Sequence, residues 1–310
     1  MIFLNQLLKG VFHAITTDKN NLLITWGDGF GDSLLLSSVA YEWKVRTGKK
    51  VAIYTKFPDL YRENPDVIIY PYMQNLIFPF KTRITKDIHF PIYAQWTPEN
   101  DFSMPPDKHI IAKMCEFVGI HNTIHLRPYF HLSEKEMETN FKYRNLILIQ
   151  TSVSSARLPM KNKEWYPSRF QEIVNVLCQN YHFIQVGSLQ DPPLQNVTDF
   201  RGKTSIRQLA CLMRQSQLFI GLVGFLMHLA RANECPSVIV YGGREHPHQS
   251  GYLCNQNIAS YISCAPCWLW NRCAYDRKCM ADITVQQVLE AAHRQLQSRS
   301  KPLEVEKFIL

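Results

Sequence analysis

The sequence lacks several features that would assign a protein to a specialised class. No run of ~18 or more apolar residues occurs, so we expect no transmembrane helix. The apolar start, residues 1–11, has neither a basic leader nor a small-residue cleavage site, which predicts mature sequence inside the cell. No basic run is dense enough for nucleic acid, and no repeat of solenoid period is present. These absences favour a globular protein with no nucleic-acid partner.

The sequence also lacks a complete dinucleotide-binding fingerprint. In Gly27-Asp28-Gly29-Phe30-Gly31 the glycine spacing is one residue short of G-x-G-x-x-G. The next expected strand, residues 51–54, is followed by Thr55-Lys56, with no acid at the ribose position. These two departures argue against an NAD enzyme.

Length and charge set the range of functions. The chain has 310 residues, enough for two domains of ordinary size, and abundant aromatic residues argue against disorder. Its formal charge of +8 suits an anionic partner such as a nucleotide, a phosphorylated glycolipid or an anionic membrane surface, although simple solubility explains it equally well.

Strand-like runs alternate with helix-like runs along both halves of the chain. The expected strands are residues 22–26, 51–54, 66–70, 125–132, 146–150, 182–186, 218–220 and 237–241. The expected helices are residues 33–47, 107–118, 167–180, 205–214, 226–232 and 284–297. This alternation predicts an α/β protein with parallel sheets and crossover helices. Residues 71–108, rich in aromatics and proline, predict long loops, and a polar stretch at 133–145 separates two expected lobes, residues 1–140 and 141–310.

Two glycine-bearing turns, nearly 200 residues apart, read as two halves of one site. Each follows an apolar run and opens a helix, an arrangement that brings free N–H groups and a positive dipole end to an anion. In the first turn Asp32 is either a capping carboxylate or a general base facing a cleft between the lobes, and Asp28 is a weaker candidate. In the second turn, from Gly224, His228 is either structural or a donor to phosphate or sugar.

Other candidate anion ligands lie between these turns. Thr151 and Ser152 follow an expected strand, where hydroxyl groups can bind phosphate oxygens. Lys163 can neutralise charge on a leaving group, although a loop lysine is more often simply solvated.

Four of the nine cysteines crowd into the segment Cys264-x2-Cys267-x5-Cys273-x5-Cys279. Four thiolates this close suit a tetrahedral zinc or iron site, and reduced structural cysteines or a redox pair are the alternative. The other five are scattered among apolar patterns and predict small core residues: Cys115, Cys178, Cys211, Cys235 and Cys254.

Taken together, these motifs resemble bacterial glycosyltransferase family 9, the ADP-heptose:lipopolysaccharide heptosyltransferases and their relatives, over about residues 20–290. The motifs that carry the resemblance are Gly29-Phe30-Gly31-Asp32-Ser33-Leu34-Leu35, Lys163-Glu164-Trp165, Met227-His228-Leu229-Ala230, and Cys264-x2-Cys267 with Arg277-Lys278-Cys279-Met280-Ala281-Asp282-Ile283-Thr284. Their combination in this order is specific, whereas any single piece is not.

The resemblance implies a GT-B fold, in which two Rossmann-like lobes with parallel sheets face an interlobe cleft and the C-terminal lobe holds most of the nucleotide-sugar donor. It implies that Asp32 is the catalytic base and that Lys163 and the helix start with Gly224, Met227 and His228 bind the donor. One branch of the family, the autotransporter heptosyltransferases, holds iron with four cysteines. The cysteine cluster of this chain is similar in kind, so a structural zinc or iron is expected while the chemistry needs no metal.

One motif departs from the family. The usual Asp-Ser/Thr-Gly-Pro before Met-His reads Val223-Gly224-Phe225-Leu226 here, so the acid that normally contacts the donor is absent. Arg244, in the turn Gly242-Gly243-Arg244, is an additional candidate donor ligand because an arginine there could pair with phosphate.

The expected function is transfer of a sugar, with ADP-heptose as the expected donor, to a hydroxyl of a lipopolysaccharide or related glycan. Protein O-heptosylation and non-catalytic binding of nucleotide sugar or glycan are the alternatives. The expected location is the cytoplasm, at the inner face of the inner membrane, with a glycan or glycolipid acceptor and peripheral membrane association.

Overall fold

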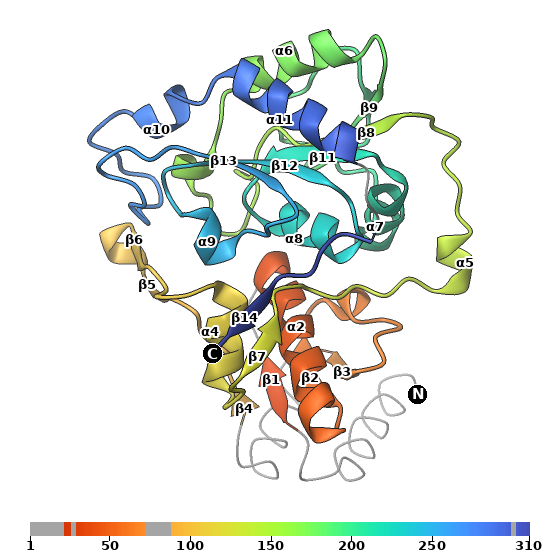
Figure 1. Ribbon diagram of the computed structural model, residues 1–310, viewed down its shortest axis with the longest axis vertical. Coiled ribbons are helices and arrows are strands. Elements are labelled where there is room, and N and C mark those ends of the chain that lie inside the picture. The colour runs from red at the N-terminus through yellow and green to blue at the C-terminus, as the bar shows by residue number, and fades with distance from the viewer. Residues whose placement is uncertain (1–21, 26–28, 72–87, 299–301) are drawn as a thin grey trace, which may run out of the picture.

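The computed structural model describes residues 22–25, 29–71, 88–298 and 302–310, and two parallel sheets organise it (Figure 1). The first sheet has the strand order β3-β2-β1-β4. Its strands are β1 (Leu23–Thr25), β2 (Val51–Thr55), β3 (Val67–Pro71) and β4 (Ile88–His89). Every residue of β2 is buried, as expected for a central strand of a covered parallel sheet.

The second sheet has six parallel strands in the order β10-β9-β8-β11-β12-β13. They are β8 (Leu146–Ile149), β9 (His182–Gln185), β10 (Thr198–Asp199), β11 (Leu218–Leu222), β12 (Ser237–Gly242) and β13 (Gln256–Ala259). The central strands β8, β11 and β12 are buried along their whole length, which explains their unbroken apolar sequences. The predicted α/β class with parallel sheets is confirmed.

The helices begin and end close to the predicted positions. They are α2 (Phe30–Thr47), α4 (Ile110–Phe117), α5 (Glu134–Met137), α6 (Pro167–Leu177), α7 (Ile206–Gln215), α8 (Phe225–Ala232), α9 (Pro247–Ser250), α10 (Lys278–Ala281) and α11 (Val285–Ser298). Short 3₁₀ turns are η1 (Pro58–Leu60), η2 (Pro98–Asn100) and η3 (Lys161–Lys163). Local chemistry fixes several ends, since α7 starts with a Ser205–Gln208 capping box and α2 ends at Gly48 with φ 71°.

Two short antiparallel pairs complete the fold. The hairpin of β5 (Gln95–Thr97) and β6 (Phe102–Met104) lies in the stretch predicted to be loops. The strand β14 (Lys307–Ile309) pairs with β7 (Thr123–His125), so the C-terminal segment returns to the first half of the molecule (Figure 1). The strand expected at 125–132 is therefore shorter and begins earlier. The lobe boundary near residue 140 falls between α5 and β8 and stays a prediction.

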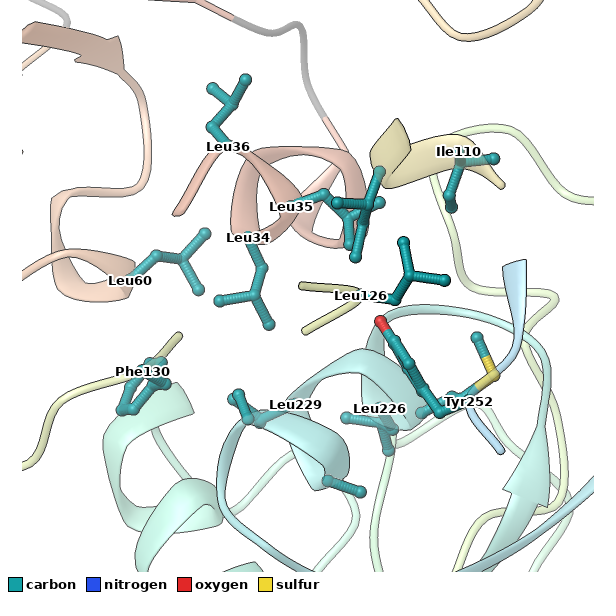
Figure 2. Close-up of a cluster of buried hydrophobic side chains, with 14 of the residues drawn as sticks. Leu34, Leu35, Leu36, Leu60, Ile110, Leu126, Phe130, Leu226, Leu229 and Tyr252 are labelled. Atoms are coloured by element: carbon teal, nitrogen blue, oxygen red, sulfur yellow. The ribbon is translucent and has the colours of Figure 1, made fainter. Parts of the chain in front are cut away.

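One apolar core joins the two halves. Figure 2 shows Leu34 and Leu35 of α2 on one side and Leu226 and Leu229 of α8 on the other, and all four belong to a single buried cluster. A second cluster lies between β8, β11 and β12 and the helices α6 and α11. Because α2 and α8 share this core, their positions relative to each other are fixed. In the parts of the chain that the structure describes, no helix is both long and apolar enough to cross a membrane.

Candidate active site

The two predicted half-sites meet at one cavity of about 870 Å³. Gly29 to Asp32 at the start of α2 line it from one side, and Gly224, Phe225 and His228 at the start of α8 line it from the other. The two turns pack closely, since a Cβ built on Gly31 would lie 3.5 Å from the Cα of Phe225. The prediction that these distant turns face one cleft is confirmed.

Asp32 lies in the first turn of α2, with its carboxylate at the cavity. The Tyr93 hydroxyl donates to Asp32 Oδ1 over 2.7 Å. Burial raises the pKa of Tyr93 well above its usual value, and the Asp32 charge raises it further. The phenol therefore remains a hydrogen-bond donor and orients the carboxylate. Asp28 and Gly27, which the sequence also singled out, lie outside the described residues.

Two cations and a buried acid form the opposite wall. Lys163 Nζ lies 2.7 Å from Glu245 Oε1, and Arg244 Nη1 lies 2.9 Å from the same oxygen. The Ser250 hydroxyl donates to Glu245 Oε2 over 2.8 Å. Burial alone would raise the pKa of Glu245, but Lys163 and Arg244 hold it at about 2. Burial lowers the pKa of Lys163, and Glu245 opposes that shift.

Glu245 is the functional candidate that the sequence analysis missed. It is 6% exposed, lines the cavity and contacts both cations. The signal was present, because Glu245 directly follows Arg244 in the turn after an apolar strand. From the sequence, an acid beside an arginine in a loop is interpreted as an exposed ion pair, because charged residues are mostly exposed. In the folded protein this turn is buried.

His228 is a neutral histidine at the cavity wall. Its Nδ1 lies 2.6 Å from the Tyr252 hydroxyl, and burial, followed by the charge of His109, lowers its pKa to about 3. When the Tyr252 hydroxyl donates to Nδ1, Nε2 carries the hydrogen and is the donor that remains. His228 is therefore placed to donate a hydrogen bond into the cavity, as expected. That hydrogen bond would come from a neutral imidazole and would not be charge-assisted.

The start of α8 presents backbone N–H groups to the cavity, because the first turn of a helix has no intrahelical acceptors for them. Gly224 is extended, with φ 160°, and a Cβ there would meet only Val153 Cγ1 at 3.5 Å. The glycine is therefore required neither by backbone conformation nor by a close approach.

Three of the expected donor ligands do not line this cavity. Thr151 is fully buried, donates to Pro192 O and accepts from Gln185 Nε2, so its hydroxyl serves the packing of the second half. Ser152 donates to Ser154 Oγ over 2.7 Å. Met227 is fully buried, and its sulfur accepts from the Tyr241 hydroxyl. Sequence position after a strand or in a helix start did not reveal these side-chain directions.

The four clustered cysteines lie beside the Gly243 turn as neighbouring free thiols. Cys267 interacts electrostatically with Cys264 and Cys273, and Cys279 interacts with Cys267 and Cys273. Among the described residues, however, no group of three or more histidine, cysteine, aspartate or glutamate side chains is arranged to hold a metal ion. The expected four-cysteine site is thus gathered by the fold but not closed around one point.

Solved structures with the same fold are glycosyltransferases. TibC, an iron-containing dodecameric glycosyltransferase of enterotoxigenic E. coli H10407, matches with a TM-score of 0.70 and 17% identity, covering 90% of this chain and 77% of TibC. The E. coli ADP-heptose lipopolysaccharide heptosyltransferase II matches with a TM-score of 0.64 and 14% identity, covering 90% of this chain and 99% of the enzyme. A family 9 glycosyltransferase of Veillonella parvula DSM 2008 matches with a TM-score of 0.61 and 12% identity, covering 90% and 98%. These likenesses confirm the predicted GT-B fold.

A family assignment rests on the sequence itself. No curated protein sequence matches the chain. The model of glycosyltransferase family 9 (heptosyltransferase) matches residues 104–272, more than half of the chain. This range includes Lys163, His228 and Arg244 at the cavity, as well as the first two clustered cysteines, Cys264 and Cys267. The chain therefore belongs to glycosyltransferase family 9, the heptosyltransferase family.

Proposed function

We propose that this glycosyltransferase moves a heptose from ADP-heptose to a hydroxyl of a lipopolysaccharide or related glycan. The observation that carries the proposal is one cavity lined by a carboxylate, Asp32, and by two cations, Lys163 and Arg244. Glycosyl transfer needs both a base for the acceptor and positive charge for the departing diphosphate. The donor is inferred from relatives, since TibC is described in complex with ADP-D-β-D-heptose and a second relative is named an ADP-heptose transferase.

In this proposal Asp32 is the general base. Its carboxylate takes the proton of the acceptor hydroxyl as that oxygen forms a bond to the anomeric carbon of the donor. The Tyr93 hydroxyl, which donates to Oδ1, orients the carboxylate for this step. The bond between the anomeric carbon and the diphosphate oxygen breaks in the same process.

The diphosphate leaves toward the second half of the molecule. Lys163 and Arg244 neutralise the charge that grows on its oxygens, and the N–H groups at the start of α8 together with neutral His228 donate hydrogen bonds. Glu245 orients the two cations before the donor arrives. The net charge of these three side chains is one positive unit, so the wall stays attractive to an anion.

A structural metal in the cysteine cluster is a further part of the proposal. The donor chemistry fits, because four thiols in a tetrahedral set suit zinc or iron, and TibC is described as iron-containing. The arrangement described here does not fit closely, because the thiols are neighbours without ligand geometry. Elemental analysis of purified protein should find about one zinc or iron per chain. A metal-free preparation with full activity and unchanged melting temperature would contradict this part alone.

We further propose that the reaction takes place on the cytoplasmic side of the inner membrane, with peripheral association to a glycolipid acceptor. The formal charge of +8 supports this because anionic lipid surfaces attract basic proteins. Sedimentation with anionic vesicles tests it, and equal partition with neutral vesicles would argue against it.

Calorimetry with ADP, GDP and UDP tests the donor, and we expect ADP to bind most tightly.

In the presence of donor and acceptor glycan, Asp32→Asn should lower turnover by about 100-fold or more, the scale of general-base loss, while the Kd for ADP stays within error. Unchanged turnover would reduce Asp32 to a helix-capping role. Transfer to a protein hydroxyl in place of glycan would overturn the proposed acceptor, and binding of no nucleotide would overturn the proposed donor.

A further inference from the structure

The loop that follows Cys267 contacts both sides of the cation wall through its own backbone. We name this segment, residues 267–272, the bridging loop. Cys267 N–H donates to Gly243 O over 3.0 Å, and Trp268 N–H donates to Arg244 O over 2.8 Å. The bridging loop thereby pairs with the turn that carries Arg244 and Glu245.

Trp268 contacts Arg244 a second time through its side chain. The Arg244 guanidinium lies over the indole ring, 4.9 Å from its centroid, and the indole N–H donates to Gln249 Oε1 over 3.0 Å. Trp268 is 3% exposed and has φ 52°, a left-handed conformation that an aromatic residue rarely adopts. Such a conformation persists where surrounding contacts impose it, and here those contacts present the ring to Arg244.

The bridging loop also holds the turn that carries Lys163. Asn162, the preceding residue, is 3% exposed, and its side-chain amide donates to Leu269 O over 3.2 Å and to Arg272 O over 2.9 Å. Its backbone N–H donates to Trp270 O. The 3₁₀ turn of Lys163 is therefore fixed from the same loop as Arg244.

The far side of the bridging loop is anchored to the β5–β6 hairpin. Trp270 N–H donates to Asp101 O, and its indole N–H donates to Ser103 Oγ over 2.7 Å. The Asp101 carboxylate accepts the backbone N–H groups of Asn271 and Arg272. Three segments that are distant in sequence, around residues 102, 162 and 244, are thus held by six consecutive residues.

We infer that the bridging loop positions the two donor-side cations, with Trp268 acting through Arg244 and Asn162 acting through Lys163. The inference rests on the proposed function, because it assigns to these cations the binding of the diphosphate. Neither residue is proposed to react with substrate. Both are positioning residues whose loss lets a cation leave the orientation that the cavity requires.

Calorimetry with ADP and with inorganic pyrophosphate tests this inference on the full chain. Trp268→Leu should weaken ADP binding by about 3–30-fold, the range of a cation–π contact. Trp268→Phe should restore most of the affinity, because it keeps a ring beneath the guanidinium. The comparison variant is Trp270→Leu, which removes an equally buried indole from the same loop on the side facing Ser103 and should weaken ADP binding less, because this ring does not lie under Arg244.

A double-mutant cycle separates positioning from general stability. On an Arg244→Ala background, Trp268→Leu should weaken ADP binding no further, because the cation it orients is gone. Asn162→Ala should likewise lower turnover in wild type and add nothing to Lys163→Ala. Circular dichroism verifies that each variant is folded. If Trp268→Leu is not folded, Trp268→Phe takes its place in these measurements.

The outcomes distinguish this inference from the proposed function. Wild type that binds neither ADP nor pyrophosphate overturns both. Wild type that binds ADP, with equal losses in Trp268→Leu and Trp270→Leu or with additive losses on the Arg244→Ala background, overturns the positioning role alone.

Discussion

At the scale of single residues, Glu245 counteracts the effect of burial on the pKa of Lys163. The lysine is buried, which favours its neutral form, and Glu245 opposes this effect with a carboxylate whose pKa of about 2 keeps it ionised. The other charges that act on Lys163 are Arg244 and Asp32. Only a protonated Lys163 can neutralise a leaving diphosphate.

We therefore expect Glu245→Gln to lower the pKa of Lys163, because the burial remains while the opposing charge is lost. A lower pKa means that Lys163 loses its proton at lower pH, so the alkaline limb of the turnover profile should move toward neutrality. Ser250→Ala is the matched control, since it removes a partner of Glu245 but leaves the charge. An alkaline limb that stays in place in Glu245→Gln would exclude this role.

His228 gives a second test at this scale. Because its pKa is about 3, the imidazole is neutral throughout the range from pH 5 to 8. His228→Ala should weaken ADP binding by about 0.5–1.5 kcal/mol, the value of a neutral hydrogen bond, and by the same amount at both ends of that range. A loss measured by calorimetry that grows toward pH 5 would mean that the histidine is protonated when it binds phosphate.

At the scale of elements, α7 is tied to the first half of the molecule by one buried arginine. Arg207 is 5% exposed, pairs with Glu136 of α5 at 2.5 Å, and donates to the carbonyl oxygens of Asp59 and His131. These contacts join α7 to α5 and η1, and the guanidinium also lies over the Phe130 ring, 5.1 Å from its centroid.

Arg207→Ala should lower the free energy of unfolding by about 1–3 kcal/mol, because hydrogen bonds to a charged group are lost and buried carbonyls are left without a donor. Arg214→Ala, in the last turn of the same helix and exposed, should change it little. Urea unfolding of the two variants provides the measurement, and equal effects would show that the position of Arg207 is not special.

At the scale of the whole molecule, the C-terminal segment joins α8 to β7. Leu303 is buried, its N–H donates to Glu234 Oε2 over 2.7 Å, and Arg231 donates to Glu304 O. Further along, Leu126 N–H donates to Glu306 O before β14 pairs with β7. One extended segment therefore bridges both halves of the molecule.

Deleting residues 302–310 should lower stability by about 2 kcal/mol or more, because a buried leucine and an entire strand pairing are removed. Differential scanning calorimetry would record the change as a lower melting temperature. ADP affinity below the melting range should be retained, since none of these residues lines the cavity. A variant that melts normally would show that the segment adds no stability.

The class of the fold and the two helix starts at the cavity could be predicted from the sequence alone. Buried parallel strands must be apolar throughout, so β8, β11 and β12 are visible as short apolar runs, and capping residues mark the helix ends. Asp32, His228 and Arg244 were predicted because they lie at helix starts or in a turn after an apolar strand, where polar groups gather at one edge of a parallel sheet. Lys163, in a loop, was predicted mainly from the family resemblance.

Which side chains face the cavity could not be predicted, because it depends on how the elements pack in the folded chain. Thr151 and Met227 turn into the core although their sequence positions match those of ligands, because side-chain direction depends on packing across elements. Glu245 and the bridging loop became visible only when residues far apart in the chain were brought together. The pairing of β14 with β7, which the whole second half of the chain separates, has no local signal, since strand pairing is a property of the folded chain.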